Sequence, residues 1–302
     1  MAALLRLKGR HRPGKSGATE TLWQMTWKRF RQHTLARIGL YIILFMCLVA
    51  LFAPIVSPYS PTSLNLELVA GSKPHPPSLR HPFGTDLLGR DYLSRAIHGG
   101  RISLSVGFVA VAFSLTIGIV VGSIAGYYGG KIDNVLCRII DILMCIPTFF
   151  LILTVNAFLK PNIFNVMVVI GVFGWMGTAR LVRGQFLALR EQEFIEAARA
   201  LGVSDARIVF RHVLPNAVAP AIVAATMGVA GAILTESSLS YLGMGVQEPT
   251  PSWGSMLRAG QVYLTRAPWL AVFPGLLIAI TVLAFNFIGD GLRDSLDPRM
   301  KR

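Results

Sequence analysis

The sequence predicts an all-α, polytopic membrane protein that crosses the bilayer six times. Hydrophobic residues make up 53% of its 302 residues and charged residues only 15%, whereas about a quarter of the residues in soluble domains are charged. The mean hydropathy is +0.56. The apolar residues are gathered in long blocks, which indicates that lipid is the solvent for most of the chain.

Six of these blocks are long enough to form a transmembrane helix. The first, 38–56, holds 19 residues without a charge. It exceeds the apolar core of a usual signal peptide, so we predict an uncleaved span. The other five are expected at 102–128, 139–159, 163–179, 216–235 and 268–289. Pro147 lies inside the third span, where neighbouring helices would cover the carbonyl group that a proline leaves unpaired.

The distribution of basic residues predicts that both chain ends are cytoplasmic. With that orientation, 21 of the 29 Lys and Arg residues fall in cytoplasmic segments and 8 in the others, in agreement with the positive-inside rule. The basic arm 1–37 is then cytoplasmic, and the segment 57–101 forms a long extracytoplasmic loop. Because the basic residues flank apolar blocks, we assign the net charge of +14 to contact with membrane lipid, and we expect no nucleic-acid binding.

The polar segment 190–215, between the fourth and fifth spans, predicts a helix, a tight turn and a second helix. Gly202 lies where a glycine would end the first helix. Ser204 is placed to cap a second helix over 205–213, and Pro215 suits the first turn of the next span. Four apolar residues share one face of the first helix: Phe194, Ile195, Ala198 and Leu201. On this pattern alone, a hairpin on the lipid surface and a hairpin that binds a protein both remain open.

The same segment also carries a recognisable motif. Its residues are Glu196, Ala197, Ala198, Gly202, Leu214 and Pro215. In this order and spacing they resemble the EAA loop of importer-type ABC transporter permeases, in which two short helices dock on an ATPase subunit. His212 stands where the general pattern has Ile, and peptide-type permeases commonly carry His there. The resemblance favours docking on a protein over the lipid-surface alternative.

Two further motifs resemble one branch of that superfamily, the dipeptide, oligopeptide and nickel permeases, and specifically their C-type membrane subunit. The outer-loop motif comprises Gly84, Thr85, Asp86, Gly89, Arg90 and Asp91. The C-terminal motif comprises Gly289, Asp290, Gly291, Arg293, Asp294, Asp297 and Pro298. Three motifs in the expected order are far more specific than one, and the resemblance covers nearly the whole chain beyond its first twenty residues.

The resemblance implies the type I fold of ABC importer permeases, with a permease core over 102–302, and a function as the translocation channel of a peptide importer in the cytoplasmic membrane. It also implies a homologous second permease in a heterodimer, two cytoplasmic ATPases, an extracytoplasmic solute-binding protein and a peptide substrate. ATP and Mg would bind to the ATPases, and no cofactor is expected on this chain. Import of nickel or of a metal chelate is the alternative within the family.

Two alternatives belong to other classes of protein. An ion-driven secondary transporter would need a carboxylate or ion site in mid-membrane, and no convincing one is present. A membrane enzyme would need a catalytic constellation, and we identify none. Gly9–Ser16 matches the phosphate-loop pattern, but it lacks the strand and helix that such a loop requires, so we expect no ATP binding there. The three cysteines have no ligand spacing, and we expect no metal site.

Few polar residues interrupt the predicted spans. Asn156 and Asn286 are candidates for lining a pathway, because polar groups within a membrane usually face the bundle interior or a cavity. A hydrogen bond to an adjacent helix is the alternative. For Glu236, at the end of the fifth span, a position that faces the bundle interior and contact with water both remain open. Arg138 and Asp141 lie three residues apart and are expected to pair on one helix face.

Overall fold

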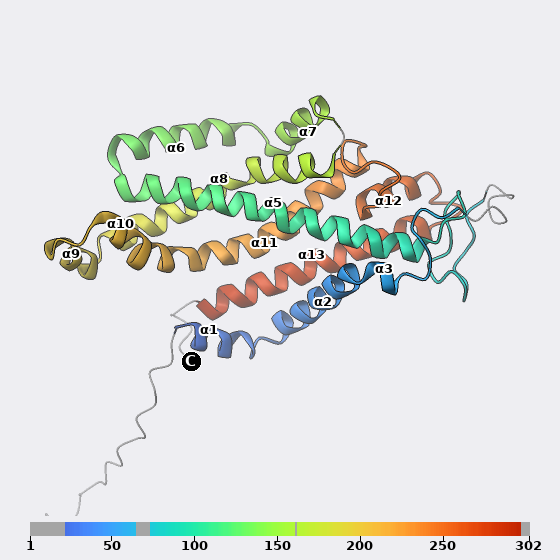
Figure 1. The fold of residues 1–302 in the computed structure, drawn as a ribbon, viewed down its shortest axis with the longest axis horizontal. Coiled ribbons are helices and arrows are strands. Elements are labelled where there is room, and N and C mark those ends of the chain that lie inside the picture. The colour runs from blue at the N-terminus through green and yellow to red at the C-terminus, as the bar shows by residue number, and fades with distance from the viewer. Residues whose placement is uncertain (1–21, 65–72, 161, 297–302) are drawn as a thin grey trace, which may run out of the picture.

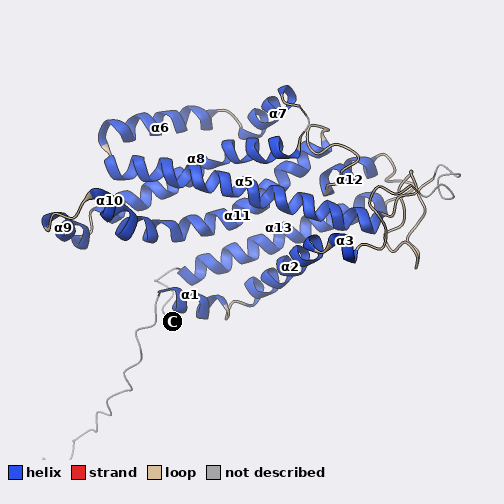
Figure 2. Cartoon of the chain, in the orientation of Figure 1, coloured by secondary structure: helices blue, strands red, loops and turns tan. Residues whose placement is uncertain are grey.

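The structure is a computed structural model that describes residues 22–64, 73–160 and 162–296. Figure 2 shows that the described residues form helices joined by turns and loops, without a strand. This confirms the predicted all-α fold. The helices run lengthwise through an elongated bundle, with long loops gathered at one end and a small helical hairpin at the other (Figure 1).

Five helices are long and apolar enough to cross a membrane. They are α2 (Thr34–Leu51), α5 (Tyr92–Tyr128), α8 (Ile163–Arg190), α11 (Leu214–Tyr241) and α13 (Trp269–Leu296). Helix α5 packs along α8 and α11, and α13 packs against α11 and α2. Most of these helices extend beyond the predicted apolar block. Helix α5 begins ten residues earlier than its predicted span, where Asp91 caps it by accepting a hydrogen bond from the amide of Ser94.

The expectation of one continuous helix for the third span was wrong. Two helices, α6 (Gly130–Cys145) and α7 (Thr148–Phe158), occupy this region and are bent by 81° at the break between them. Pro147 lies at that break, at the N-terminal end of α7. Proline has no N–H group and disfavours a helical conformation in the residue before it, here Ile146, which is extended. Counting the bent pair as one span gives six in the described part of the chain.

Three shorter helices complete the described bundle: α1 (Leu22–Phe30), α3 (Ala53–Val56) and α12 (Trp253–Gln261). Helix α1 packs on α13, and α3 continues the first predicted span after the end of α2. Helix α12 packs against α5, α11 and α13. It therefore lies over the ends of three membrane helices, on the side where the long loops gather (Figure 1).

Glycines allow α5 and α8 to approach closely. A Cβ atom at Gly118 would lie 2.6 Å from Cβ of Thr178, and one at Gly122 would lie 2.5 Å from the carbonyl oxygen of Ala179. At Gly126 the carbonyl oxygen of Arg183 would be 2.8 Å away. Small residues in such contacts let helix backbones pack together inside a membrane, where the hydrophobic effect does not drive helices together.

Candidate functional site

The hairpin consists of α9 (Glu193–Ala200), the short helix α10 (Asp205–Ile208) and one π-helical turn, η1 (Val209–Val213). It projects from the bundle and defines what we call the hairpin end (Figure 1). Gly202, between α9 and α10, has a φ angle of +74°, a conformation that glycine adopts without the steric cost of a side chain. Helix, turn and second helix thus follow the order predicted from the sequence.

Two details of that prediction were wrong. Ser204 lies at the start of α10, but its side chain makes no capping hydrogen bond. The second helix does not end before the next span. It continues through η1 into α11, so that one helical segment runs from Asp205 to Tyr241. Pro215 lies in the first turn of α11, where its missing N–H group does not end the helix.

The apolar side chains of the hairpin point in two directions. Ile195, Ile208 and Val213 are fully buried against α8 and α11. By contrast, Leu201 is 83% exposed and Phe210 is 70% exposed. Phe194 is also exposed, so the four apolar residues predicted to share one face are divided between the bundle and the surface. The buried set fixes the hairpin to the bundle, and the exposed set remains accessible on its surface.

A polar contact joins the hairpin to α5. The hydroxyl group of Tyr127 donates a hydrogen bond to the carboxylate of Asp205 at the start of α10. The guanidinium group of Arg199 in α9 lies 5.8 Å from the centre of the Tyr127 ring, within the range of a cation–π interaction. The predicted docking residues Glu196 and Ala197 are exposed on α9.

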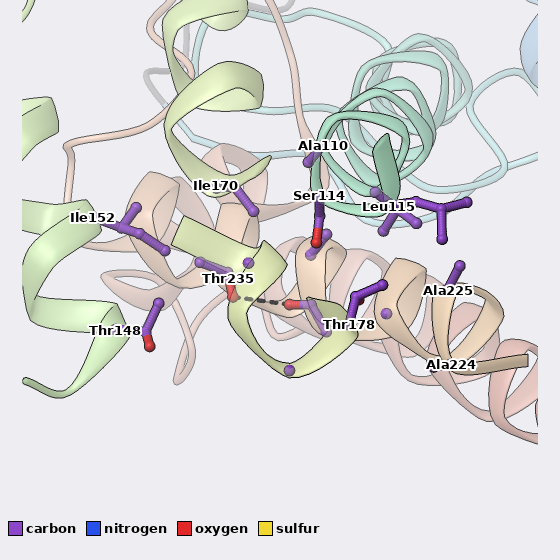
Figure 3. Close-up of a pocket in the computed structure, with 16 residues that line it drawn as sticks. Ala110, Ser114, Leu115, Thr148, Ile152, Ile170, Thr178, Ala224, Ala225 and Thr235 are labelled. Carbon is purple, nitrogen blue, oxygen red and sulfur yellow. Dashed lines mark hydrogen bonds between the residues drawn. The ribbon is translucent and has the colours of Figure 1, made fainter. Parts of the chain in front are cut away.

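A cavity of about 350 Å³ lies between α5, α7, α8 and α11. Figure 3 shows that side chains from several helices converge on it. Four hydroxyl groups line it, from Ser114, Thr148, Thr178 and Thr235, and the remaining lining residues are glycine, alanine and larger aliphatic residues, none of them charged. The cavity therefore offers hydrogen bonds without a fixed charge. Neither Asn156 nor Asn286 is among its lining residues.

The two asparagines lie elsewhere in the bundle. Asn156 is buried in α7, and its Nδ2 atom has no hydrogen-bond partner among the described residues. Asn286 is half-buried on α13. Their role in a pathway stays a prediction.

The outer-loop motif builds a compact turn at the opposite end of the bundle, which we call the loop end. The carboxylate of Asp86 accepts hydrogen bonds from the amides of Leu88 and Arg90 and pairs with the Arg90 side chain at 2.7 Å. Gly84 and Gly89 have positive φ angles of 75° and 69°. Thr85 is fully buried, and its hydroxyl oxygen accepts a hydrogen bond from the backbone of the same loop. The motif therefore shapes the loop through its own backbone.

An ion-pair cluster connects this turn to the loop that precedes α12. Arg90 and Arg95 both pair with the carboxylate of Glu248, at 2.8 Å and 2.7 Å. Arg95 is 2% exposed, whereas Glu248 is half exposed. Asp91 of the motif pairs with His81 at 2.8 Å and caps α5. Residues far apart in the sequence are thus held together by charge at the loop end.

The C-terminal motif is a packing surface of α13. A side chain at Gly289 would collide with Met227 of α11, and one at Gly291 would collide with Ala36 of α2. Asp294 pairs with His33 at 3.6 Å. Asp290 and Arg293 are exposed or nearly so. Asp297 and Pro298 lie outside the described residues, as does the Gly9–Ser16 segment.

The expected pair between Arg138 and Asp141 is replaced by pairs between helices. Asp141 of α6 pairs with Arg180 of α8 at 2.5 Å, and Asp133 pairs with Arg183 at 2.5 Å. The spacing along one helix identified Asp141 as a carboxylate that needs a basic partner. Because α8 approaches closely, Arg180 is that partner. These pairs join the helical segments on either side of the bent region.

The sequence left open whether Glu236 faces the bundle interior or contacts water, and the structure places it in the interior. Its side chain is fully buried at the loop end. It is surrounded by serine hydroxyl groups of α5 and α11. The nearby run of serines after Glu236 in the sequence was the available signal, because hydroxyl groups at helical spacing can satisfy a buried carboxylate.

An all-helical membrane bundle with a projecting hairpin and an uncharged cavity has the architecture of a transport subunit. Residues 118–302 match the family described as the inner membrane component of binding-protein-dependent transport systems. Residues 21–77 match the N-terminal transmembrane domain of oligopeptide transport permease C. The chain belongs to this family of transport permeases, which confirms the family predicted from its motifs, and it is a multi-pass inner-membrane protein.

Individual relatives match along most of their length. The chain is 44% identical to the dipeptide transport system permease protein DppC of Alkalihalophilus pseudofirmus, over 92% of this chain and 90% of the relative. It is 42% identical to the oligopeptide transport system permease protein OppC of Bacillus subtilis, over 93% and 91%. It is also 42% identical to the glutathione transport system permease protein GsiD of Escherichia coli, over 95% and 94%.

A solved structure shares the fold. The MetNI methionine ABC transporter, in an inward-facing conformation, matches with a TM-score of 0.51 over 66% of this chain and 95% of that chain. At 24% sequence identity, this likeness concerns the arrangement of helices. It agrees with the predicted importer-permease fold.

Proposed function

We propose that this chain is the channel-forming subunit of an ATP-driven importer of di- and oligopeptides. The observation that carries the proposal is the exposed apolar surface of the hairpin, formed by Phe194, Leu201 and Phe210. Exposed apolar side chains on a polar projection fit a protein interface. The motif from Glu196 to Pro215 identifies the expected occupant as a separate ATPase subunit, which would bind ATP and Mg.

The hairpin is suited to transmit movement of an ATPase to the cavity. One helical segment runs without interruption from Asp205 to Tyr241. Ala224, Gly228 and Gly231, in the middle of this segment, line the cavity. A displaced hairpin would therefore move the cavity wall. The hydrogen bond between Tyr127 and Asp205 would carry α5 along with it.

The cavity supports a peptide as the substrate. Hydroxyl groups can exchange hydrogen bonds with the amide groups of any peptide backbone, and an uncharged wall does not select for the charge of its side chains. Two relatives are named as permeases of dipeptide and oligopeptide transport systems. A solute-binding protein and a second, homologous permease would complete the pathway.

Glutathione is a second candidate substrate. The observation in its favour is the relative named as a glutathione transport permease, which matches over 95% of this chain at 42% identity. Glutathione is itself a small peptide, so the same cavity chemistry would serve. Uptake of labelled dipeptide, longer peptide and glutathione by the complete transporter in vesicles distinguishes these substrates directly.

Two variants test the coupling role of the hairpin. We expect Gly202→Val and Glu196→Lys to lower both ATPase association and peptide uptake at least about tenfold. A residue with a side chain costs roughly 1–2 kcal/mol in the left-handed conformation of Gly202, and Glu196→Lys reverses an exposed charge within the docking motif. Pull-down of the ATPases and vesicle uptake measure the two effects. Gly184→Val is the control, since a side chain there meets open space. Normal association and normal uptake in both variants would reject the docking assignment.

The orientation of the chain belongs to the same proposal: the hairpin end, with both chain termini, faces the cytoplasm. Basic residues support it by a ratio of 21 to 8. In a background without native cysteines, a cysteine at the exposed Thr250 should react with an impermeant reagent in intact cells. A cysteine at Ser204 should react only after permeabilisation. Labelling of the Ser204 site in intact cells would contradict this orientation and would indicate the opposite one.

A further inference from the structure

The carboxylate of Glu236 is buried, and the proposed mechanism does not use it. Ser240 donates a hydrogen bond to its Oε1 atom at 2.7 Å, and Ser103 donates one to its Oε2 atom at 3.1 Å. Ser237 lies 3.5 Å from the same Oε2 atom. The carboxylate thus receives hydroxyl groups from both α5 and α11. Such a group in a membrane helix usually has a function.

Backbone amides set the direction of these hydrogen bonds. The amide of Val246 donates to Oγ of Ser240 at 2.9 Å, and the amide of Trp253 donates to Oγ of Ser103 at 3.2 Å. A serine hydroxyl group has a single hydrogen. Since each hydroxyl oxygen already accepts from an amide, its own hydrogen can be directed at Glu236. Two relays therefore run from the backbone through a hydroxyl group to one carboxylate.

The relays join parts of the chain that are distant in sequence. Ser103 belongs to α5, Val246 to the loop 242–252, and Trp253 to the first turn of α12. The parts are tightly packed as well: a Cβ atom at Gly254 would lie 2.6 Å from Cα of Ser237. Helix α12 and its loop are thus held against α5 and α11.

The cavity-lining face of α11 begins one residue from Glu236. Thr235, Gly231, Gly228 and Ala224 recur at helical spacing and line the cavity. A side chain at Gly231 would meet nothing within 4 Å, so at this position no neighbouring side chain holds the cavity face of the helix. One residue corresponds to about 100° around an α-helix. A side chain held at position 236 therefore also sets the direction of Thr235.

We propose that Glu236 is a positioning residue for transport. Its hydrogen-bonded carboxylate fixes the rotation of α11 about the helix axis, and this keeps the small residues of α11 facing the cavity. The inference rests on the proposed function of that cavity as the peptide path. Glu236 itself does not contact the peptide. Loss of a hydroxyl donor should let α11 rotate and change the exposure of Thr235.

The experiment uses a matched pair of serines on α11. Ser240→Ala removes a donor to Glu236, whereas Ser238→Ala removes an exposed hydroxyl group that bonds to the carbonyl of Leu234. Both are placed in the complete transporter, without native cysteines and with Thr235→Cys. The rate of reaction with a small thiol reagent reports the exposure of the cavity wall. Uptake of labelled dipeptide is measured in the same preparations.

We expect Ser240→Ala to change the labelling rate and to lower uptake by about tenfold or more, as the loss of a hydrogen bond to a charged group predicts. Basal ATPase activity should stay within twofold, and Ser238→Ala should change none of these values. Glu236→Gln should act in the same direction, because an amide NH2 group would replace one of the two carboxylate oxygens and would face a hydroxyl donor there. It also serves as the second variant if Ser240→Ala does not assemble.

Unchanged labelling in Ser240→Ala and Glu236→Gln would overturn the inference, whether or not uptake falls, because the cavity wall would not have moved. The proposed function fails separately. If excess dipeptide does not protect Thr235→Cys from the reagent in the otherwise native chain, the cavity is not the peptide path. Protection together with altered labelling in the two variants supports both.

Discussion

The hairpin end and the loop end of this permease are stabilised in different ways. At the hairpin end, three buried aliphatic side chains and one hydrogen bond from α5 attach a projection whose other face is exposed. At the loop end, Arg95, Glu236 and Trp253 are buried in a network of ion pairs and hydrogen bonds among α5, α11 and α12. In the proposed function the hairpin acts as a lever, whereas the network at the loop end holds the positions of the helices.

The difference follows from what each end must do in the proposed importer. A docking element must leave its apolar side chains available to a partner, and an interface of that kind gains stability only when the partner binds. A region that fixes helices must satisfy its polar groups internally, because an unpaired buried polar group is costly. Substitutions at the loop end should therefore affect global stability, and those at the hairpin end should affect local order and coupling.

The largest expected effect is that of Gly254→Val at the loop end. The new side chain would press on the backbone of Ser237, whose carbonyl oxygen lies 2.7 Å from the Cβ position. Overpacking against an immobile backbone should cost about 3 kcal/mol or more. We expect most of the protein to be lost from the monodisperse fraction in size-exclusion chromatography. Gly184→Val, in open space, is the control. Equal yields of the two would mean that α12 can move away from α11.

Arg95→Gln is expected to have the next largest effect. It removes the buried partner of Glu248 and leaves Asp86 with one cation fewer. We expect a loss of about 2–3 kcal/mol, below the usual value for a buried pair because Glu248 is half exposed. Thermal unfolding in detergent measures it. Arg180→Gln breaks a pair whose partners are both about half exposed and should cost at most about 1 kcal/mol. A smaller loss for Arg95 than for Arg180 would contradict the proposed contrast.

Gly202→Ala should produce a local effect at the hairpin end. An alanine with the positive φ angle of Gly202 is less stable by about 1–2 kcal/mol. Few contacts join this turn to the bundle, so the strain should remain local. We expect faster hydrogen exchange of amides in 193–213 and an unchanged unfolding temperature. A large fall in unfolding temperature would show that the hairpin is part of the global folding unit.

Tyr127→Phe should have the smallest effect of the four. It removes the hydrogen bond to Asp205 while it keeps the ring that faces Arg199. We expect a loss of about 1 kcal/mol, visible as faster exchange in α10 and as weaker stimulation of uptake by ATP. Tyr128→Phe is the matched control, because Tyr128 is 64% exposed. If the two variants behave alike, the hydrogen bond does not couple α5 to the hairpin.

The two ends also differ in how well the sequence predicted them. The hairpin was predicted from local signals: apolar residues at helical spacing, a glycine at the turn and a proline in the next first turn. The loop end was not, because Arg95, Glu236 and Glu248 find partners more than a hundred residues away. For Glu236 the sequence left contact with water open, because it shows the position at a span end but does not show the serine partner in α5.

By itself, the sequence determined the all-helical membrane architecture, the position of the apolar blocks, the order of the hairpin and the family, because each depends on composition, on periodicity within one segment or on short motifs. Only the tertiary structure decided that the third span is broken at Pro147, that Asp141 pairs with Arg180 and that Glu236 is buried. A proline can either kink or break a helix, and the other two features depend on which helices approach closely. Close approach is set by the combined packing of small residues on several helices, which no single segment specifies.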